Sequence, residues 1–337
     1  MRAVVVERAG NARLSELAVP EPNAVEVLVR VAAAGICGSD LDILRGTRPA
    51  AYVRYPVVPG HEWAGTVVKV GTDVRGIAVG DRIVAEGFRS CGVCDRCREG
   101  RTNLCAADYA ETGFTHQGAF AEYVSVPAHL VHVLPAGADL EAAALLEPAA
   151  CVACGLLEAD LRPGLRTAVV GAGALGLLAV SILRLTSPSY LALIGSRQAR
   201  LDLGRRVGAD DAFDVNTESL DSLRESFDLV FEAANRPQAA VTALEAARRG
   251  GTVILEGISS AVDPAIRADA ITLKHLRVQG IFGASGAAWT WAVELFASGR
   301  LPLRELISHR FALEDFESAF GMLEDRQGGA VKVELVP

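Results

Sequence analysis

A glycine-rich turn between an apolar run and a helical segment constrains the fold of this chain most strongly. Residues 167–170 read TAVV, and GAGALG follows over residues 171–176, which matches G-x-G-x-x-G. In that pattern the first glycine permits a tight turn, the second lets a pyrophosphate approach the backbone, and the third allows close packing of helix on strand. The start of the helix also offers free N–H groups to phosphate oxygens. The pattern therefore predicts a dinucleotide-binding turn. Its candidate cofactor contacts are Gly171, Gly173, Ala174, Leu175 and Gly176.

The segments behind this turn alternate between apolar runs and helical patterns. Six strand candidates lie between residues 167 and 284, namely TAVV, YLALIG, AFDV, FDLVFEAA, TVILEGI and LRVQGIFGA. Such alternation is typical of a parallel sheet with crossover helices on both faces. Residues 1–135 instead alternate short β-branched runs with Gly, Pro and Asp turns, which favours antiparallel strands. We therefore expect an α/β protein with a six-stranded, doubly wound Rossmann domain and a second, mostly β domain.

The two ends of the chain indicate how these domains are connected. The 337 residues allow about two domains. Strand-like runs at Arg2–Val6 and Val331–Val336 suggest that both termini join one domain and that the nucleotide-type domain is an insertion. We predict a catalytic domain over residues 1–152, a dinucleotide-binding domain over residues 153–287, and a return to the catalytic domain over residues 288–337.

Composition excludes several classes of protein. The formal net charge of −8 argues against binding to duplex nucleic acid or to an anionic membrane surface. The most apolar stretch, Thr167–Leu183, has 17 residues with three glycines among them, and this is short for a bilayer span. The N-terminal MRAVVVERAG has no apolar signal segment. We therefore expect a cytoplasmic protein with a small-molecule substrate and with neither nucleic acid nor membrane as a partner.

Four of the seven cysteines are closely spaced. Cys91, Cys94, Cys97 and Cys105 form C-x2-C-x2-C-x7-C. In a reducing compartment clustered cysteines indicate a metal site rather than disulfides. Four thiolates suit a closed, tetrahedral structural zinc site. An iron–sulfur cluster also uses four cysteines, but the neighbouring signals point to hydride chemistry, which needs no iron.

A second set of potential metal ligands is dispersed along the chain. It consists of Cys37 in GICGSD, His61 and Glu62 in PGHEWAG, and Glu147 in LLEPAAC. A catalytic zinc takes three protein ligands and keeps one position for water or substrate. Taken singly, each residue has an ordinary structural explanation, since a cysteine after a strand is usually a core residue.

These motifs together resemble the zinc-dependent medium-chain dehydrogenase/reductase family. GICGSD, PGHEWAG, the four-cysteine loop, LLEPAA and GAGALG occur in the family's order and cover nearly the whole chain. The Glu of LLEP and the GHE triplet resemble the polyol, sorbitol and threonine dehydrogenase branch. The resemblance implies a GroES-like catalytic domain and a structural zinc in the four-cysteine loop. It also implies a catalytic zinc held by Cys37 and His61, with Glu62 and Glu147 as alternatives for the remaining coordination.

The resemblance also implies how a proton leaves the substrate. Ser39 matches the hydroxyl that takes the alcohol proton, and Asp40 matches the carboxylate that orients the ligand histidine, a role that metal chemistry also predicts. Many members carry a relay histidine five residues after the first cysteine ligand, where this chain has Asp42. Either Asp42 serves as the base, or water reaches the site directly.

The end of the second strand of the nucleotide domain indicates which nicotinamide cofactor is preferred. An acidic residue that binds the adenosine ribose is expected there, but the chain has Ser196 and Arg197, with Arg200 close by. The nearest carboxylate, Asp202, lies a helical turn further on. A hydroxyl and a planar guanidinium suit a ribose 2′-phosphate. We therefore predict NADP(H) over NAD(H); the Gly-Ser-Arg triplet also resembles NADP-dependent secondary alcohol dehydrogenases of the family.

Together these patterns predict a zinc-dependent alcohol or polyol dehydrogenase. It would transfer a hydride between a secondary alcohol, such as a polyol, sugar or amino alcohol, and NAD(P). One alternative is a zinc-independent enone or quinone reductase of the same fold, against which Cys37, His61 and Glu147 argue; another is a non-catalytic binding protein that keeps the fold. The loop between Cys37 and His61 carries Arg45, Arg48, Tyr52 and Arg54, which are candidates for contact with a polar or anionic substrate. The resemblance implies a homodimer or homotetramer.

Overall fold

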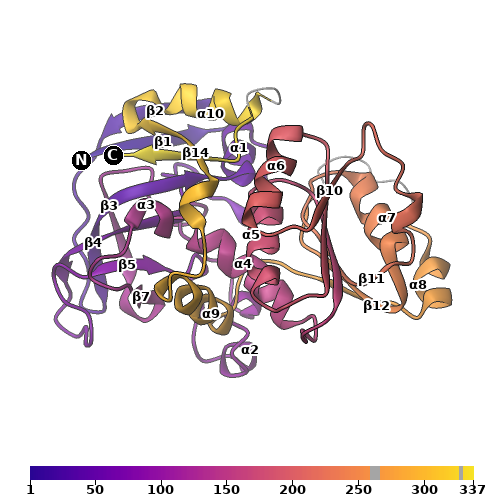
Figure 1. Ribbon diagram of the computed structural model, residues 1–337. Helices are drawn as coiled ribbons and strands as arrows, with labels where there is room; N and C mark the ends of the chain where they lie inside the picture. Colours follow the sequence, from indigo (N-terminus) through magenta and orange to yellow (C-terminus); the bar gives the residue numbers. More distant parts are fainter. Residues whose placement is uncertain (259–265, 326–328) are drawn as a thin grey trace. The chain divides into compact units, whose positions relative to one another are not determined.

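The computed structural model describes residues 1–258, 266–325 and 329–337. Its chain divides into two compact units (Figure 1). The first comprises Met1–Glu147, Ala284–Gly299 and Leu303–Pro337, and the second comprises Pro148–Gly283 and Arg300–Pro302. Both chain ends therefore belong to the first unit. The assignment of catalytic and cofactor-binding roles to particular residue ranges stays a prediction.

The first unit is built on a seven-stranded sheet. Its order is β14-β15-β3-β4-β5-β7, with β6 paired to β3. These strands are β3 (Glu26–Ile36), β4 (Glu62–Val70), β5 (Arg82–Ala85), β6 (Tyr123–Pro127), β7 (Val131–Val133), β14 (Ile307–Ala312) and β15 (Lys332–Val336). Every pair is antiparallel except β14 with β15. A separate antiparallel pair joins β1 (Arg2–Arg8) and β2 (Asn11–Glu16).

Alternating side chains from these strands form the core of the first unit. Val29 and Val67 are fully buried in one cluster with Phe120 and Leu335. Burial of such side chains is the main source of stability, at roughly 1.5–3 kcal/mol for each one removed from water. The last strand of the chain thus completes the core that its first strands begin.

Short helices surround this sheet. They are α1 (Gly38–Arg45), α2 (Asp95–Arg98), α3 (Leu140–Ala143), α9 (Gly286–Ala297) and α10 (Phe316–Glu324), with 3-10 turns at Ala50–Tyr52, Thr102–Leu104, Ala128–Leu130, Leu303–Leu306 and Leu313–Asp315. α4 (Leu146–Leu157) begins in the first unit and continues into the second. The Ser285 side chain accepts a hydrogen bond from the N–H of Ala288 and so caps α9.

The second unit contains a six-stranded parallel sheet. Its order, β10-β9-β8-β11-β12-β13, is the 3-2-1-4-5-6 order of a Rossmann fold when the strands are numbered along the unit. The strands are β8 (Arg166–Val170), β9 (Tyr190–Gly195), β10 (Asp211–Asp214), β11 (Phe227–Glu232), β12 (Ala247–Leu255) and β13 (Arg277–Gly280). This confirms the predicted fold class.

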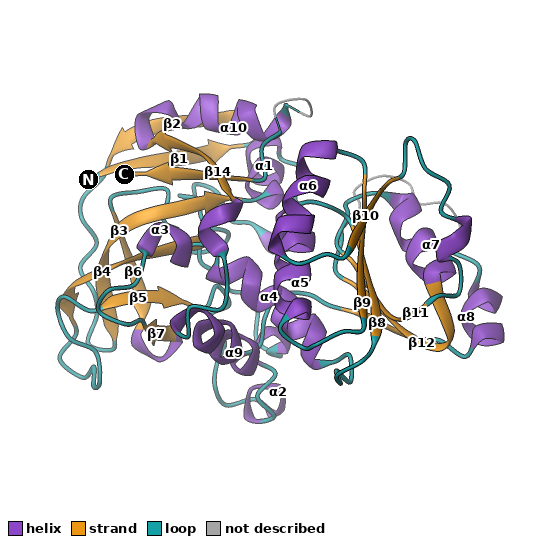
Figure 2. Ribbon diagram, in the orientation of Figure 1, coloured by secondary structure: helices purple, strands orange, loops and turns teal. Residues whose placement is uncertain are grey.

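Helices cover both faces of the parallel sheet (Figure 2). α5 (Ala174–Arg184) and α6 (Gln198–Val207) lie on one face, and α7 (Pro237–Ala246) and α8 (Ala268–Lys274) lie on the other. Because both faces are covered, the central strands read as continuous apolar runs. Ala168, Ile194 and Val230 are accordingly buried in one cluster. Within the described residues, no helix combines the length and apolar character needed to cross a membrane.

Candidate functional site

The buried carboxylate of Asp40 organises the start of α1. β3 ends at Ile36, and Cys37 is the residue that precedes the first turn of α1. Asp40 Oδ2 accepts a hydrogen bond of 2.8 Å from the N–H of Cys37, and Oδ1 accepts one of 3.3 Å from the N–H of Gly60. One side chain therefore fixes two backbone segments, one beside Cys37 and the other beside His61.

Strand pairing brings Cys37, His61 and Glu62 together. Glu62 begins β4 and lies opposite Gly35 of β3 in the antiparallel ladder. The potential ligand atoms of Cys37, His61 and Glu62 all lie within 4.8 Å of one another. Their donor set of one thiolate, one imidazole and one carboxylate is typical of zinc. The predicted residues are thus gathered from two separate segments of the first unit.

Acidic neighbours control the protonation of His61. Its Nδ1 lies 3.5 Å from Asp40 Oδ1, and both side chains are buried. Burial alone would lower the pKa of His61, yet the charge of Asp40, hydrogen bonding to Cys37 and the charge of Glu147 hold this pKa well above its usual value. Glu147, the fourth predicted ligand, is therefore close enough for its charge to act on His61. Asp40 faces Nδ1, so Nε2 is the ring nitrogen left for a metal.

A buried lysine that the sequence analysis missed contacts this site. The Nζ of Lys332, on β15, forms an ion pair with Glu62 Oε2 and donates a 3.3 Å hydrogen bond to the carbonyl oxygen of Ile36. Burial would lower the pKa of Lys332, but the charges of Glu62, Cys37 and Glu147 raise it. Lys332 therefore stays a cation and binds one oxygen of Glu62. A signal was present in the sequence, since a lysine interrupts the apolar C-terminal run VKVELV.

Glu111 is a second residue of this site that the sequence analysis missed. Glu111 is buried, and its Oε2 accepts a hydrogen bond from the Tyr109 hydroxyl. Burial raises the pKa of Glu111 to about 8, and the charge of Glu147 acts in the same direction, whereas His61 and Arg48 lower it. Glu111 therefore lies among the charged groups that surround His61. It stands in YAETGF, outside every motif considered above.

The predicted proton-transfer residues lie along α1. Ser39 is half-buried in the first turn of α1, next to Asp40. The Asp42 side chain is also half-buried, and its Oδ1 accepts a 2.9 Å hydrogen bond from the Thr47 hydroxyl. All three predicted residues thus follow Cys37 on one short helix.

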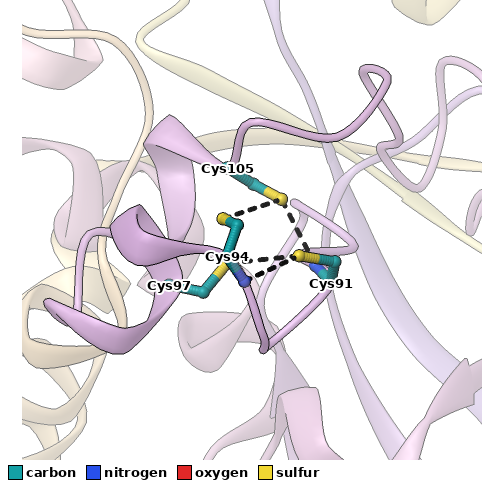
Figure 3. Close-up of side chains that lie close together, drawn as sticks. All are labelled: Cys91, Cys94, Cys97 and Cys105. Carbon is teal, nitrogen blue, oxygen red and sulfur yellow. Dashed lines mark hydrogen bonds between the residues drawn. The ribbon is translucent and has the colours of Figure 1, made fainter.

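The four-cysteine loop places its sulfurs as a tetrahedral metal site requires (Figure 3). The Sγ atoms of Cys91 and Cys97 are 3.9 Å apart, and those of Cys94 and Cys105 are 4.0 Å apart. A tetrahedron with zinc–sulfur bonds of about 2.3 Å has edges of about 3.8 Å. None of the seven cysteines, all of which lie in the described residues, forms a disulfide. Distances and donor type both fit one zinc ion.

Backbone N–H groups of the loop also favour thiolates. Cys91 N–H donates to Cys105 Sγ at 3.3 Å, Cys94 N–H donates to Cys91 Sγ at 3.4 Å, and Ala106 N–H donates to Cys94 Sγ at 3.5 Å. The hydrogen bonds from the backbone of Ala106 and of Cys97 lower the pKa of Cys94 to about 6. Since a metal binds the thiolate, these bonds prepare the loop for a cation.

The glycine-rich turn has the geometry that its motif predicts. Gly171 has φ +114°, and a Cβ there would lie 2.9 Å from the backbone of Ala233 and Ala234. A Cβ on Gly176 would lie 1.7 Å from the carbonyl oxygen of Gly171. A Cβ on Gly173 would meet no atom within 4 Å. Gly173 is the residue before α5, and it has no side chain that could cap the helix. Gly173 thus leaves open space at a helix N-terminus, the position at which the motif predicts a pyrophosphate.

Two arginines follow β9 at the predicted ribose position. Ser196 is exposed, Arg197 immediately precedes α6, and Arg200 is half-buried in its first turn. Burial, together with the charge of Arg197, lowers the pKa of Arg200 to about 10. The carboxylate of Asp202 is hydrogen-bonded to Gln198 at 2.8 Å and to Arg205 at 2.9 Å. The nearest acidic side chain in the sequence is therefore engaged along its own helix.

Comparison with known proteins assigns the family. The model of the alcohol dehydrogenase GroES-like domain matches residues 23–136, and the model of the glucose dehydrogenase C-terminus matches residues 143–335. The chain belongs to the zinc-dependent medium-chain dehydrogenase/reductase family. The resemblance drawn from the sequence motifs is confirmed. As a member of this family, the protein is an oxidoreductase that acts on alcohol CH–OH groups with NAD(P).

Three relatives show how far the similarity extends. L-threonine 3-dehydrogenase of Burkholderia thailandensis is 33% identical over 334 residues, which cover 97% of this chain and 96% of the relative. A zinc-binding dehydrogenase of Sinorhizobium meliloti, solved with NADP, is 32% identical with a TM-score of 0.92, covering 100% of this chain and 99% of the other. An alcohol dehydrogenase of Escherichia coli, solved with NADH, is 28% identical with the same TM-score of 0.92 and the same coverage, 100% and 99%.

Proposed function

We propose that this protein oxidises a secondary alcohol of the polyol, sugar or amino alcohol class, with transfer of hydride to NADP. The observation that carries the proposal is the convergence of Cys37, His61 and Glu62, whose ligand atoms lie within 4.8 Å of one another. A zinc-independent reductase of this fold would have no need for that donor set. The threonine 3-dehydrogenase relative is named for an amino alcohol substrate, and this supports the proposed class.

The proposed catalytic zinc is held by Cys37, His61 and a carboxylate from Glu62 or Glu147. When bound, zinc supplies Lewis-acid polarisation of the alcohol oxygen. Asp40 holds the imidazole of His61 in orientation from the Nδ1 side, where it lies at 3.5 Å. Lys332 holds Oε2 of Glu62, so Oε1 is the oxygen that Glu62 has left for a metal. Glu147 has in its favour that its charge acts on His61.

The proposed proton path begins at Ser39. Its hydroxyl accepts the proton of the alcohol and passes it either to Asp42 or to water. The Asp42 carboxylate accepts one hydrogen bond from Thr47, which leaves its other oxygen available for a proton. A second zinc in the four-cysteine loop, held by Cys91, Cys94, Cys97 and Cys105, has a structural role in this proposal.

The proposed cofactor site is the turn at residues 171–176, extended by Ser196, Arg197 and Arg200. Burial and the charge of Arg197 together lower the pKa of Arg200, and a bound 2′-phosphate would offset both by pairing with the two guanidinium groups. One relative was solved with NADP and another with NADH, so the family accommodates both. A charge-assisted bond would give about 10- to 150-fold preference for NADP. The ratio of kcat/KM for the two cofactors tests this, and a preference for NAD, or no change in Arg197→Ala, contradicts it.

The proposal also includes the roles of the domains, the assembly of the chain and its location. Residues 1–152 and 288–337 would form the catalytic domain, and residues 153–287 the cofactor domain. The chain would assemble as a homodimer or homotetramer, which light scattering during gel filtration measures directly. Its cytoplasmic location also stays a prediction.

A substrate screen that follows nicotinamide absorbance tests the proposed function. The panel contains polyols, amino alcohols and simple secondary alcohols, each offered with NADP and with NAD, and the zinc content is measured on the same sample. Turnover of a secondary alcohol by protein that holds about one zinc beyond the structural ion is the expected result. No turnover by zinc-loaded protein would favour the non-catalytic alternative. Reduction of enones by protein that lacks the second zinc would favour the zinc-independent reductase.

A further inference from the structure

The guanidinium of Arg48 has hydrogen-bond donors to spare. Arg48 lies in the segment between Cys37 and His61 and is half-buried. Its Nη2 donates to the Tyr109 hydroxyl at 3.1 Å, and its Nε donates to the Tyr52 carbonyl oxygen at 3.4 Å. Nη1 makes no hydrogen bond, and no carboxylate lies within 4.0 Å of the guanidinium, within the residues that the structure describes. Arg48 is therefore a cation without an ion-pair partner in that part of the chain.

Aromatic rings hold this guanidinium next to the candidate zinc site. Its central carbon lies 4.1 Å from the centre of the Phe114 ring and 5.8 Å from that of Tyr52. Phe114 in turn packs against the His61 imidazole, with 4.8 Å between ring centres. One ring thus separates Arg48 from a proposed metal ligand. A substrate of several carbons that reacts beside His61 is long enough to reach Arg48.

A directed chain of hydrogen bonds fixes the position of Arg48. The Tyr109 hydroxyl accepts a hydrogen bond from Arg48 Nη2 and donates one to Glu111 Oε2, so both of these bonds run in the same direction. The Tyr109 ring is held by edge contacts with Tyr52 at 4.8 Å and with Phe88 at 5.9 Å between ring centres. The buried Glu111 anchors the other end. A guanidinium held on both an aromatic face and a hydrogen-bonded chain is preorganised to bind a ligand.

We propose that Arg48 is a specificity-determining residue that binds an anionic group of the substrate, a carboxylate or a phosphate. This rests on the proposed function, since the same molecule carries the hydroxyl that reacts near His61. The free Nη1 donors and the planar guanidinium suit bidentate contact with either anion. The substrate class would then be a hydroxylated carboxylate or a polyol phosphate rather than a neutral alcohol.

Three substrates of equal chain length test this inference: a polyol, the aldonate derived from it, and its monophosphate. kcat and KM are measured for each with the wild-type enzyme, Arg48→Gln, Arg48→Lys and Arg75→Gln. Arg75 is an exposed arginine between β4 and β5 that donates to the carbonyl oxygens of Thr72 and Val74 in its own turn, so Arg75→Gln removes the same charge elsewhere on the surface. Zinc content and circular dichroism confirm that each variant is folded and loaded.

We expect Arg48→Gln to lower kcat/KM for an anionic substrate relative to the polyol by about tenfold or more, mainly through KM. Arg48→Lys should lower this ratio less, because an ammonium keeps the charge but loses the planar fork. Arg75→Gln should leave the ratio unchanged. Whether the aldonate or the monophosphate shows the larger change identifies the anion. If Arg48→Gln does not fold, Arg48→Lys takes its place, and a smaller decrease of the same kcat/KM ratio is the expected result.

The inference is overturned if the ratio of kcat/KM for an anionic substrate to kcat/KM for the polyol is unchanged in both Arg48 variants. An equal loss of activity on all three substrates is one such case. Wild-type turnover of the polyol with an unchanged ratio would remove this inference and leave the proposed function intact. Wild-type enzyme that oxidises no alcohol would remove the proposed function itself.

Discussion

The two candidate metal sites differ in how the chain builds them. The four-cysteine loop gathers its ligands from one short segment, with Cys91 and Cys105 only 14 positions apart, and backbone N–H groups of the same loop hold its sulfurs. The site at Cys37 and His61 depends instead on the pairing of β3 with β4 and of β15 with β3. Of its side chains, His61 and Glu62 are buried and Cys37 is half-buried.

This difference separates the roles that a metal plays in the two places. Short helices and turns make up the loop around Cys91, so an ion there replaces the packing that the segment lacks. The hydrophobic core of the same sheet is built from fully buried side chains such as Val29, Val67 and Phe120, none of which is a potential metal ligand. We therefore expect zinc to stabilise the first site and to enable chemistry at the second.

The strongest expected effect separates the two sites by mutation. His61→Ala and Cys37→Ser should reduce turnover below detection and leave the melting temperature within a few degrees of wild type, because the core does not depend on these ligands. Cys94→Ser should instead lower stability by an amount on the order of several kcal/mol, because structural zinc binding is coupled to folding. Steady-state kinetics and thermal unfolding of the three variants measure both effects. Equal losses of melting temperature in all three, with activity kept in His61→Ala, would remove the distinction.

A smaller effect concerns the route of the proton at the buried site. If Asp42 passes the proton on, Asp42→Asn should lower turnover by about 100-fold and change the dependence of rate on pH. Thr47→Val is a matched control that keeps the Asp42 carboxylate and removes the hydrogen bonds of the Thr47 hydroxyl to the Asp42 side chain, at 2.9 Å, and to the Asp42 carbonyl oxygen, at 3.5 Å. An unchanged pH–rate profile in Asp42→Asn would show that the proton leaves through water instead.

The orienting carboxylate should matter for metal affinity at one site only. Asp40→Asn should weaken zinc binding at His61 by about 10- to 100-fold, the usual cost of losing a carboxylate behind a ligand histidine. Competition with a chelator of known affinity, at the two sites separately, measures this. The cysteine loop should keep its zinc in this variant, and loss of both ions together would contradict the separation of the two sites.

The smallest expected effect is a pH dependence of stability that arises at the buried site. Burial raises the pKa of Glu111 to about 8. The folded state of the metal-free protein then holds this proton more tightly than the unfolded state does, so stability falls as pH rises from the ordinary carboxyl range to about 8. Glu111→Gln should remove a decline on the order of 1–3 kcal/mol across that range.

Urea unfolding at several pH values, after treatment with a chelator, measures this contribution. Glu317→Gln, at an exposed position of α10, is the matched control and should leave the slope of stability against pH unchanged. An identical slope in wild type and Glu111→Gln would show that Glu111 is not held neutral by burial.

Local patterns were sufficient to predict much of this molecule. The six strands of the second unit and the glycine turn could be predicted because apolar runs and glycine spacing are properties of neighbouring residues. The cysteine loop could be predicted for the same reason. Residues Cys37, His61 and Glu62 could be grouped as potential ligands from their type, but only the family resemblance implied that they act together, because their proximity comes from strand pairing.

Lys332 and Glu111 show where sequence reasoning ended. Lys332 contacts Glu62 from 270 positions away, through the antiparallel pairing of the last strand with β3. Glu111 acquires its role from burial and from Tyr109, neither of which the sequence around it signals. Long-range register and burial were therefore the missing information for both residues. Arg48 was one of four candidate substrate contacts in its segment, and only the structure supplied the contacts that distinguish it.

Zinc content, measured site by site, tests the central claim most directly. Wild-type protein purified without chelator should hold about two zinc ions per chain, one at each site. His61→Ala with Cys37→Ser should hold about one and keep its fold, and that ion should be lost when Cys94→Ser is added. A double variant that still holds two ions, or wild-type protein that never holds more than one, would contradict the account of a catalytic zinc built on β3 and β4.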